Sequence, residues 1–172
     1  MDIILLKQSI VDSSCEAIVN AANDALMAGG GVCGAIFRAA GYRELQDACD
    51  KIGGCKTGNA VITPGFSLKT KYVIHAVGPI YRGEESAKDL EGAYYNSLKR
   101  ADENGIKSIA FPAISTGIYG YPLEDAAKVT FDAIRKYVDN YPNSGIEIVE
   151  FDLIDDYTYT VFERAYRNSI LR

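Results

Sequence analysis

Short apolar runs alternate along the chain with longer segments whose apolar residues recur every three or four positions. The short runs are typical of buried strands, and the longer segments are typical of helices that bury one face. Glycine or proline follows most of these segments and ends them. The pattern predicts strands near residues 3–6, 17–19, 59–63, 72–77 and 108–111 and within 146–153, and helices near 31–40, 42–52, 87–104, 123–140 and 155–170.

This alternation indicates an α/β sandwich with a largely parallel sheet and helices on both of its faces. The first two predicted strands are an exception, because the segment between them is too short for a helical crossover. We therefore expect the mixed part of the sheet at that edge. No internal repeat, linker or low-complexity tract divides the chain, so residues 1–172 are expected to form one domain.

Three consecutive glycines, Gly29 to Gly31, lie between the second predicted strand and the first predicted helix. Glycine lets the backbone approach a ligand closely, and the first amides of a helix have no partner within it. Such amides bind anions. Asn23 precedes the glycines, and its side chain can both donate to and accept from the hydroxyls of a ribose. The alternative is a flexible surface turn, although turns rarely combine three glycines with neighbouring asparagines.

A second loop that contains glycine follows the predicted strand at 108–111 and precedes the helix at 123–140. In open α/β sheets, ligands bind beyond the carboxyl ends of the strands, so both loops are expected at the same rim. Two walls of backbone amides suit a diphosphate better than a single phosphate. Ser115 and Thr116 add hydroxyl donors to the second wall, and Tyr119 is placed to cover a sugar.

Two familiar nucleotide-binding motifs do not fit these loops. Gly29-x-Gly31-x-x-Gly34 has the spelling of the dinucleotide fingerprint, but residues 20–28 separate it from the end of the preceding strand. The fingerprint also requires a later strand that ends in an acidic residue, and none follows at the right distance. A P-loop requires a lysine after its glycines, and none is present. An NAD-dependent oxidoreductase is therefore nearly excluded.

Cysteine and histidine are too sparse to favour a metal site. The four cysteines, Cys15, Cys33, Cys49 and Cys55, show no paired CxxC spacing, and His75 is the one histidine. A structural zinc ion takes four ligands of these types, so no metal is expected. His75 lies in an apolar predicted strand, where a core role is more common than a catalytic one.

The charge balance argues against nucleic acid and membranes as partners. The formal net charge is −5, and an acidic surface repels phosphate backbones and anionic lipids. The amino terminus lacks the basic segment of a signal peptide, and no apolar run approaches membrane-spanning length. We therefore expect a cytoplasmic protein with reduced cysteines.

Four stretches of the chain carry a further signal: IVNAAN at 18–23, GGGVCGAI at 29–36, HAVGP at 75–79 and AFPAISTGIYGYP at 110–122. Together they resemble the macrodomain family, and most closely its MacroD-type branch. The resemblance implies a three-layer α/β/α sandwich with a mixed, largely parallel six-stranded sheet and a cleft that binds ADP-ribose. It also implies hydrolysis of ADP-ribosyl groups from acidic side chains, or of O-acetyl-ADP-ribose, with no cofactor.

The resemblance further implies roles for individual residues. Ser9 and Ile10 fall where the family contacts adenine, and Ile154 falls near the residue that covers it. Asn23 falls where the family orients the distal ribose, and Asn23 and Cys33 are the candidate catalytic positions. One side of the diphosphate and distal ribose is lined by Gly30, Gly31, Val32 and Cys33, and the other wall is formed by Ser115, Thr116, Gly117, Ile118 and Tyr119.

Three residues depart from the family pattern. The branch usually has an aspartate at the position of Cys33, often assigned a catalytic role, and commonly a histidine at the position of Phe37. The adenine-reading aspartate of the family aligns with Ser9, so that contact is expected to be weaker here. Macrodomains that use catalytic zinc place histidine and cysteine in the glycine loop. This loop has one cysteine and no histidine, so zinc is not expected.

Two functions from different classes stay open. One is an ADP-ribosyl hydrolase or O-acetyl-ADP-ribose deacetylase, in which the bound diphosphate positions or deprotonates a water and Asn23 helps to hold the distal ribose. The other is a non-catalytic module that reads ADP-ribose, including on mono-ADP-ribosylated proteins, and the residues Cys33 and Phe37 favour it. A nucleophilic role for Cys33 would need a neighbouring base. Because the chain offers no second histidine, a role in lining the pocket is the better interpretation of Cys33.

Overall fold

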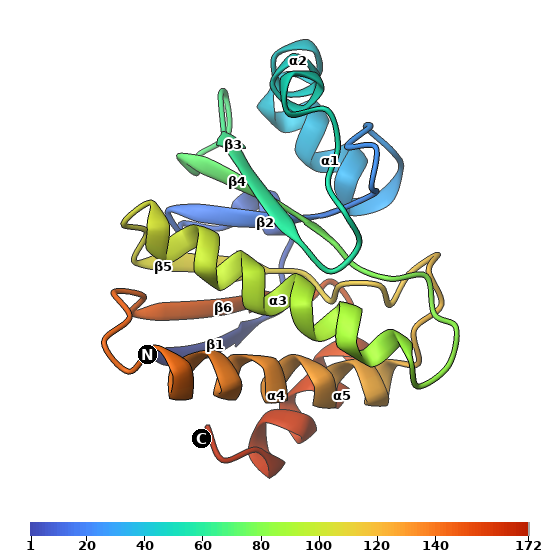
Figure 1. Cartoon of the computed structure of the whole chain (residues 1–172), viewed down its shortest axis with the longest axis vertical. Helices are drawn as coiled ribbons and strands as arrows, with labels where there is room; N and C mark the ends of the chain where they lie inside the picture. Colours follow the sequence, from blue (N-terminus) through green and yellow to red (C-terminus); the bar gives the residue numbers. More distant parts are fainter. Residues whose placement is uncertain (172) are drawn as a thin grey trace.

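A six-stranded sheet forms the centre of the structure, a computed structural model that describes residues 1–171 (Figure 1). The strand order is β1-β6-β5-β2-β4-β3. All neighbouring strands are parallel except β3 and β4, which are antiparallel. The strands are β1 (Asp2–Leu6), β2 (Ala17–Ala22), β3 (Ala60–Pro64), β4 (Tyr72–Val77), β5 (Ser108–Phe111) and β6 (Ile148–Asp152).

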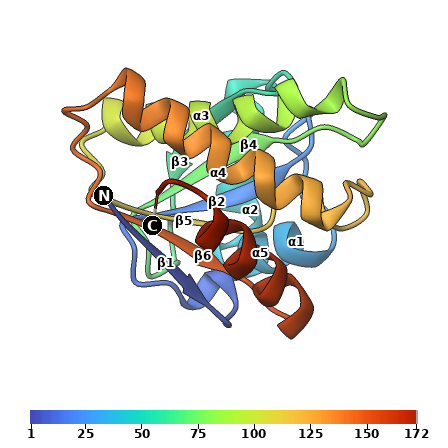
Figure 2. The same ribbon diagram turned by 90° about the horizontal axis from the view of Figure 1, so that it is seen from below.

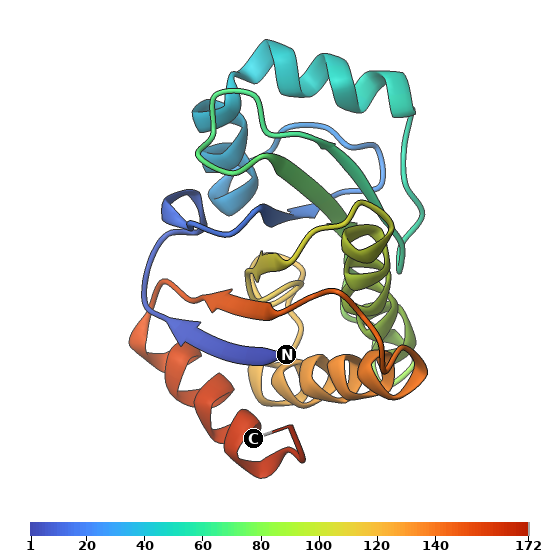
Figure 3. The same ribbon diagram turned by 90° about the vertical axis from the view of Figure 1, so that its left-hand side faces the viewer.

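Two groups of helices cover the two faces of this sheet. Helices α3, α4 and α5 pack on one face, and α1 and α2 pack on the other together with the 3-10 helix η1. Figures 1 and 3 show α1 and α2 at the end of the molecule near β3, and α4 and α5 at the end near β1. This arrangement confirms the predicted three-layer α/β/α fold. The helices are η1 (Ile10–Asp12), α1 (Gly31–Ala40), α2 (Tyr42–Ile52), α3 (Ser86–Glu103), α4 (Leu123–Asn140) and α5 (Asp156–Asn168).

Alternate residues of the central strands face opposite layers. In β5, Ile109 and Phe111 pack in the layer of α3 and α4, whereas Ala110 packs in the layer of α1. Successive side chains of a strand point to opposite faces, so a strand covered on both faces is apolar throughout. This is why the strands were visible in the sequence as short continuous apolar runs. No helix within residues 1–171 is both long and apolar enough to cross a membrane.

The antiparallel pair lies at the opposite edge of the sheet from the one expected. Strands β1 and β2 are not neighbours, because β6 and β5 lie between them, and β1 pairs with β6 in parallel. The prediction of a mixed edge at β1 and β2 was therefore wrong. The antiparallel strands are β3 and β4, whose connection at 65–71 is too short for a crossover. Strand β2 also runs past Val19 to Ala22, so Asn20 lies within it.

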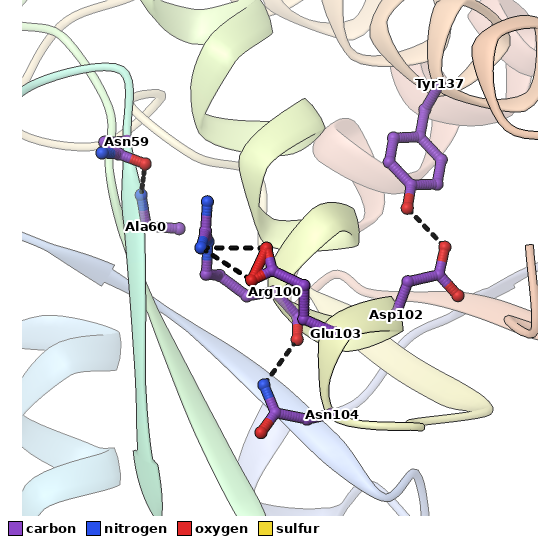
Figure 4. Close-up of polar contacts among 7 residues, drawn as sticks. All are labelled: Asn59, Ala60, Arg100, Asp102, Glu103, Asn104 and Tyr137. Carbon is purple, nitrogen blue, oxygen red and sulfur yellow. Dashed lines mark hydrogen bonds and ion pairs between the residues drawn. The ribbon is translucent and has the colours of Figure 1, made fainter.

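Polar contacts at the end of α3 join it to α4, which runs beside it (Figure 2). The hydroxyl of Tyr137 in α4 donates to Asp102 in α3 (Figure 4). The hydroxyl of Ser144 also donates to Asp102 over 2.6 Å, and the amide of Gly145 does so over 3.0 Å. Asp102 therefore holds the loop between α4 and β6 against the end of α3.

His75 is fully buried in β4, and both of its ring nitrogens have polar neighbours. The Nδ2 of Asn20 donates to its Nδ1 over 3.2 Å, so Nε2 carries the proton of the neutral ring. Nε2 donates to the hydroxyl of Thr63 over 2.9 Å, and this hydroxyl donates to the carbonyl of Pro64. Burial lowers the pKa of His75 to about 4. His75 is thus a neutral core residue, as the sequence pattern favoured.

We expect the substitution His75→Gln to reduce the pH dependence of unfolding. The pKa of His75 is about 4 in the folded chain and 6.5 at its ordinary value, so the unfolded chain takes up the proton first as the pH falls. The wild type should lose about 2 kcal/mol of unfolding free energy through this group between pH 7.5 and pH 5. Urea unfolding of both proteins over this range measures the difference, and groups common to both cancel. A difference that does not change with pH would contradict the buried neutral state.

Candidate functional site

A cavity of about 520 Å³ lies at the edge of the sheet where the carboxyl ends of β6, β5, β2 and β4 meet. This volume is in the range of small-molecule binding sites. Each of the four strands leads into a segment that lines it. The lining residues are Ala21 to Asn23 and Gly29 to Cys33 from β2 onward, Gly78 after β4, Pro112 to Tyr119 after β5, and Asp152 to Asp155 with Thr158 from β6 onward.

The first wall of the cavity is the glycine loop, residues 29–33. A Cβ atom added to Gly29 or Gly30 would meet no protein atom within 4 Å, so packing does not require glycine there. Gly31 has a φ of +56°, in the left-handed region that favours glycine. A Cβ at Gly34 would lie 2.6 Å from the carbonyl oxygen of Gly29, so Gly34 lets the loop fold back on α1. The amides at the start of α1 have no partner within the helix and border the open space.

Asn23 clamps the segment that leads into the glycine loop. Its Nδ2 donates to the carbonyl of Met27 over 2.8 Å, and its Oδ1 accepts from the amide of Met27 over 3.0 Å. The Sγ of Cys33 lies 3.9 Å from the same carbonyl. The two candidate catalytic side chains therefore meet at Met27. One amide proton and one lone pair of Asn23 remain for a ligand.

Gln46 of α2 holds the same segment from the protein interior. It is buried, its Nε2 donates to the carbonyl of Leu26 over 3.0 Å, and its Oε1 accepts from the amide of Ala28 over 2.9 Å. These two bonds satisfy backbone groups that regular secondary structure does not pair. Gln46 therefore fixes the entry to the glycine loop without lining the cavity.

The second wall is the serine loop, residues 112–119. Ser115 has a φ of +67°, a conformation that costs a serine on the order of 1 to 3 kcal/mol. A Cβ at Gly78 would collide with the side chain of Ser115, so glycine at 78 makes room for this loop. The Oγ of Ser115 is buried with no hydrogen-bond partner in residues 1–171. The amides of residues 117–119 also donate to no group that the structure describes. This wall therefore presents strained backbone and unpaired donors, which are typical of functional sites.

Two carboxyl side chains line the third side of the cavity, at the end of β6. Asp155 caps α5: its Oδ1 accepts from the amide of Thr158 over 2.7 Å, and its Oδ2 accepts from the hydroxyl of Thr158 over 3.0 Å. Asp152 is only 4% exposed. Its Oδ1 accepts from the Nε2 of Gln8 over 3.1 Å, whereas its Oδ2 has no partner among the described residues.

The cavity brings together all of the predicted site residues except Ser9 and Ile10. Ile10 is buried in the core layer beneath α1, and Ser9 precedes η1 with a half-buried side chain. Whether the other residues bind a ligand stays a prediction. Those that line the cavity are Asn23, Gly30, Gly31, Val32, Cys33, Ser115, Thr116, Gly117, Ile118, Tyr119 and Ile154.

Sequence reasoning predicted Ile154 after β6 but missed the polar residues there, Asp152, Asp155 and Thr158. Asp152 was hidden in a run that reads as an ordinary buried strand, although Glu150 and Asp152 are carboxylates at alternate positions within it. Carboxylates are rarely buried without a reason, so this alternation was the available signal. Asp155 and Thr158 have the spacing of a helix N-cap, which accounts for their contacts without a ligand.

The chemistry of the lining favours an anion held by dipoles. No lysine, arginine or histidine lines the cavity in the described part of the chain. No group of three or more histidine, cysteine, aspartate or glutamate side chains gathers as a candidate metal site within residues 1–171. Backbone amides and small hydroxyls are the donors that remain, and amides of this kind bind phosphate groups.

A second cavity, of about 700 Å³, lies near the amino ends of β5 and β6, beside Asp102 and Tyr137. Both carboxylates that line it already have partners, because Asp102 accepts hydrogen bonds from Tyr137, Ser144 and Gly145, and Glu103 forms an ion pair with Arg100. The hydrogen bonds to Asp102 serve the packing of α3 against α4 (Figure 4). The first cavity is therefore the candidate site.

Comparisons with known proteins show to which family the sequence is similar and which solved structures have the same fold. The profile of the family described as "Macro domain" matches residues 19–130. A protein of Salmonella typhimurium named O-acetyl-ADP-ribose deacetylase is 48% identical over 166 residues, which cover 93% of this chain and 91% of that protein. The solved structure of the Trypanosoma brucei macrodomain in complex with ADP-ribose superposes with a TM-score of 0.87 at 36% identity, over 95% of this chain and 68% of the other. For the Oceanobacillus iheyensis macrodomain with ADP, the TM-score is 0.88 at 34% identity, over 95% and 88%.

We expect Gln46→Met to loosen the entry to the glycine loop. Methionine has a similar size but leaves the carbonyl of Leu26 and the amide of Ala28 without partners, which costs about 1 to 3 kcal/mol of unfolding free energy. Urea unfolding measures the loss, and hydrogen exchange should become faster in residues 24–33. Asp47→Asn, at an exposed neighbouring position of α2, is the control. Unchanged exchange in this segment would show that Gln46 does not hold it.

Proposed function

Because this chain belongs to the macrodomain family, we propose that its cavity binds ADP-ribose and that the protein hydrolyses ADP-ribosyl esters. The substrates are O-acetyl-ADP-ribose and proteins that carry mono-ADP-ribosyl groups on acidic side chains. The observation that carries the proposal is the pair of cavity walls with unpaired amides, which suits a diphosphate. The name of the Salmonella relative supports the same substrate class.

In this proposal the diphosphate lies between the glycine loop and the serine loop. Amides of both loops donate to its oxygens, and the buried hydroxyl of Ser115 gains a partner. Ile154 lines the cavity and is 68% exposed, so it can cover an apolar base. Asn23 keeps a donor and an acceptor for the hydroxyls of the distal ribose. Binding by amides explains how a chain with a net charge of −5 holds an anion.

Hydrolysis requires a water placed against the carbonyl carbon of the ester. With the diphosphate and the distal ribose fixed, a phosphate oxygen accepts a hydrogen bond from that water and orients it. The water oxygen bonds to the carbonyl carbon, the bond from that carbon to the ribose oxygen breaks, and the proton ends on the ribose oxygen. The products are ADP-ribose and acetate, or ADP-ribose and the free carboxyl side chain. Positioning of this kind supplies several kcal/mol without a protein base.

Cys33 is the residue whose chemistry bears most on whether the protein hydrolyses its ligand or only binds it. Residues 29–33 contain no carboxylate. Both ring nitrogens of His75 are occupied within the core, so this histidine cannot activate the thiol of Cys33. These features support a water oriented by the substrate and argue against a nucleophilic cysteine. They also suit the second candidate function, a non-catalytic module that reads ADP-ribose on modified proteins.

We expect the wild type to release ADP-ribose from O-acetyl-ADP-ribose and from a mono-ADP-ribosylated protein, and Asn23→Ala to slow this release by about tenfold to a hundredfold. The reason is the loss of the side chain that orients the distal ribose. Chromatography of free ADP-ribose over time measures the rate, and calorimetry measures binding separately. Tight binding with no release over hours would favour the reader function. No binding at all would contradict both functions.

Substitutions at Cys33 separate the catalytic routes. If the substrate orients the water, Cys33→Ala should change kcat by less than about tenfold, because the side chain only lines the pocket. Release assays at saturating substrate measure kcat for the wild type, Cys33→Ala and Cys33→Asp. A loss of about a thousandfold in Cys33→Ala would instead indicate a nucleophile. A clear gain in Cys33→Asp would show that a carboxylate at this position takes part in the reaction.

A further inference from the structure

Asp152 is the carboxyl side chain of the cavity lining that keeps an unpartnered oxygen. Of the two carboxyls that line the cavity, Asp155 uses both oxygens to cap α5. Asp152 is 4% exposed, and its Oδ2 is buried with no partner among residues 1–171. Burying an unpaired polar atom costs free energy, so such an atom beside a cavity marks a position where a ligand can supply the partner.

The groups that act on Asp152 are acidic or uncharged: Glu150, Asp12 and Gln8. Glu150, two residues earlier on the same face of β6, is 6% exposed and accepts from Ser13 over 2.8 Å and from Gln8 over 3.3 Å. Gln8 therefore bridges the two carboxyls. No ion pair of the described residues includes either carboxyl.

These surroundings favour a proton on Asp152. The pKa of Asp152 rises to about 8, first because of burial and then because of the neighbouring carboxyl of Glu150, with Asp12 of η1 adding to the rise and the hydrogen bond from Gln8 opposing it. The other titratable group that faces the pair is Cys15, whose pKa rises to about 11, so it stays a thiol through pH 9. The protonated form of Asp152 is therefore favoured at neutral pH, and this form has one O–H donor and free acceptor capacity.

The strand order indicates which part of the ligand lies here. Neighbouring strands are about 4.8 Å apart, so the end of β6 lies about 10 Å from the end of β2, with β5 between them. A diphosphate between the loops after β2 and β5 leaves the two outer ends, at β4 and at β6, for the two nucleoside halves. Only Gly78 lines the cavity at β4, whereas β6 supplies both carboxyl and apolar lining. The half that carries the base therefore fits the end at β6.

We propose that Asp152, supported by Glu150 and Gln8, is the residue that selects the base of the bound nucleotide. Its Oδ2–H donates to a ring nitrogen of adenine, and its Oδ1 accepts from the neighbouring 6-amino group, since adenine presents an acceptor beside a donor. The inference rests on the proposed binding of ADP-ribose and adds the residue that reads its base. Ser9, which does not line the cavity, is not needed for this contact.

The test compares the wild type, Asp152→Asn and Asp152→Leu by calorimetry at pH 7 and pH 9. Asparagine keeps a donor and an acceptor but does not titrate, and leucine removes both. The ligands are ADP-ribose and ribose 5-diphosphate, which keeps a ribose and the diphosphate but has no base. We expect the wild type to bind ADP-ribose about tenfold more weakly at pH 9, because the acid ionises near pH 8. The affinity of Asp152→Asn for ADP-ribose should stay within about threefold of the wild-type affinity at pH 7, and it should not fall at pH 9. Asp152→Leu should bind ADP-ribose about tenfold more weakly than the wild type at pH 7.

Binding of ribose 5-diphosphate should be the same in all three proteins. Wild-type affinity of Asp152→Leu for ADP-ribose would overturn the assignment of Asp152 and leave the proposed function intact. An equal loss of both ligands in Asp152→Leu would also overturn it, because that result indicates a disturbed cavity wall. A wild type that binds no ADP-ribose would overturn the proposed function, and the assignment of Asp152 with it.

Discussion

The parallel pairing of β6, β5, β2 and β4 is the constraint on which the site depends. Parallel strands end at one edge of a sheet, so four segments that are far apart in the sequence meet there. The pairing is stable because each central strand is buried on both faces, by α3 to α5 on one side and by α1 and α2 on the other. Packing of ordinary apolar residues thus fixes where the loops begin. The loops themselves are then shaped by few residues: Gly78 makes room for Ser115, and Gln46 and Asn23 hold the entry to the glycine loop.

The proposed anion site lies in an acidic chain and has no basic side chain in the described lining of the cavity. Amides are fixed dipoles that need no counterion, and they keep their donors at any pH. The unpaired Oγ of Ser115 and its left-handed backbone conformation each cost free energy, and the surrounding packing holds the residue in this state. Such a site can hold a ligand without catalysing a reaction. For this reason the proposed hydrolysis depends on the groups beside the ligand, and Cys33 is the candidate catalytic side chain of the glycine loop.

Much of this structure could be predicted from the sequence, because the strands are short apolar runs and glycine marks the ends of α1 and α2. The strand order at the β1 edge of the sheet could not be predicted, because β1 pairs with β6, which lies almost at the other end of the chain. Asn23 and nine residues of the two loops were expected at one site because they follow strands that end together. Ser9, Ile10 and Ile154 were expected from the resemblance alone, and of these three Ile154 lines the cavity whereas Ser9 and Ile10 do not. Asp152 was missed because its exposure and its unpaired oxygen are tertiary properties, although its carboxylate in an apolar strand was visible.

The central claim is that a diphosphate binds between the glycine loop and the serine loop. A crystal structure of the chain with ADP-ribose tests it most directly. The account predicts phosphate oxygens within hydrogen-bond distance of amides from both loops, at residues 31–33 and 117–119, with the base at the end of β6. A ligand bound elsewhere, or a diphosphate that contacts only one of the two walls, would contradict it.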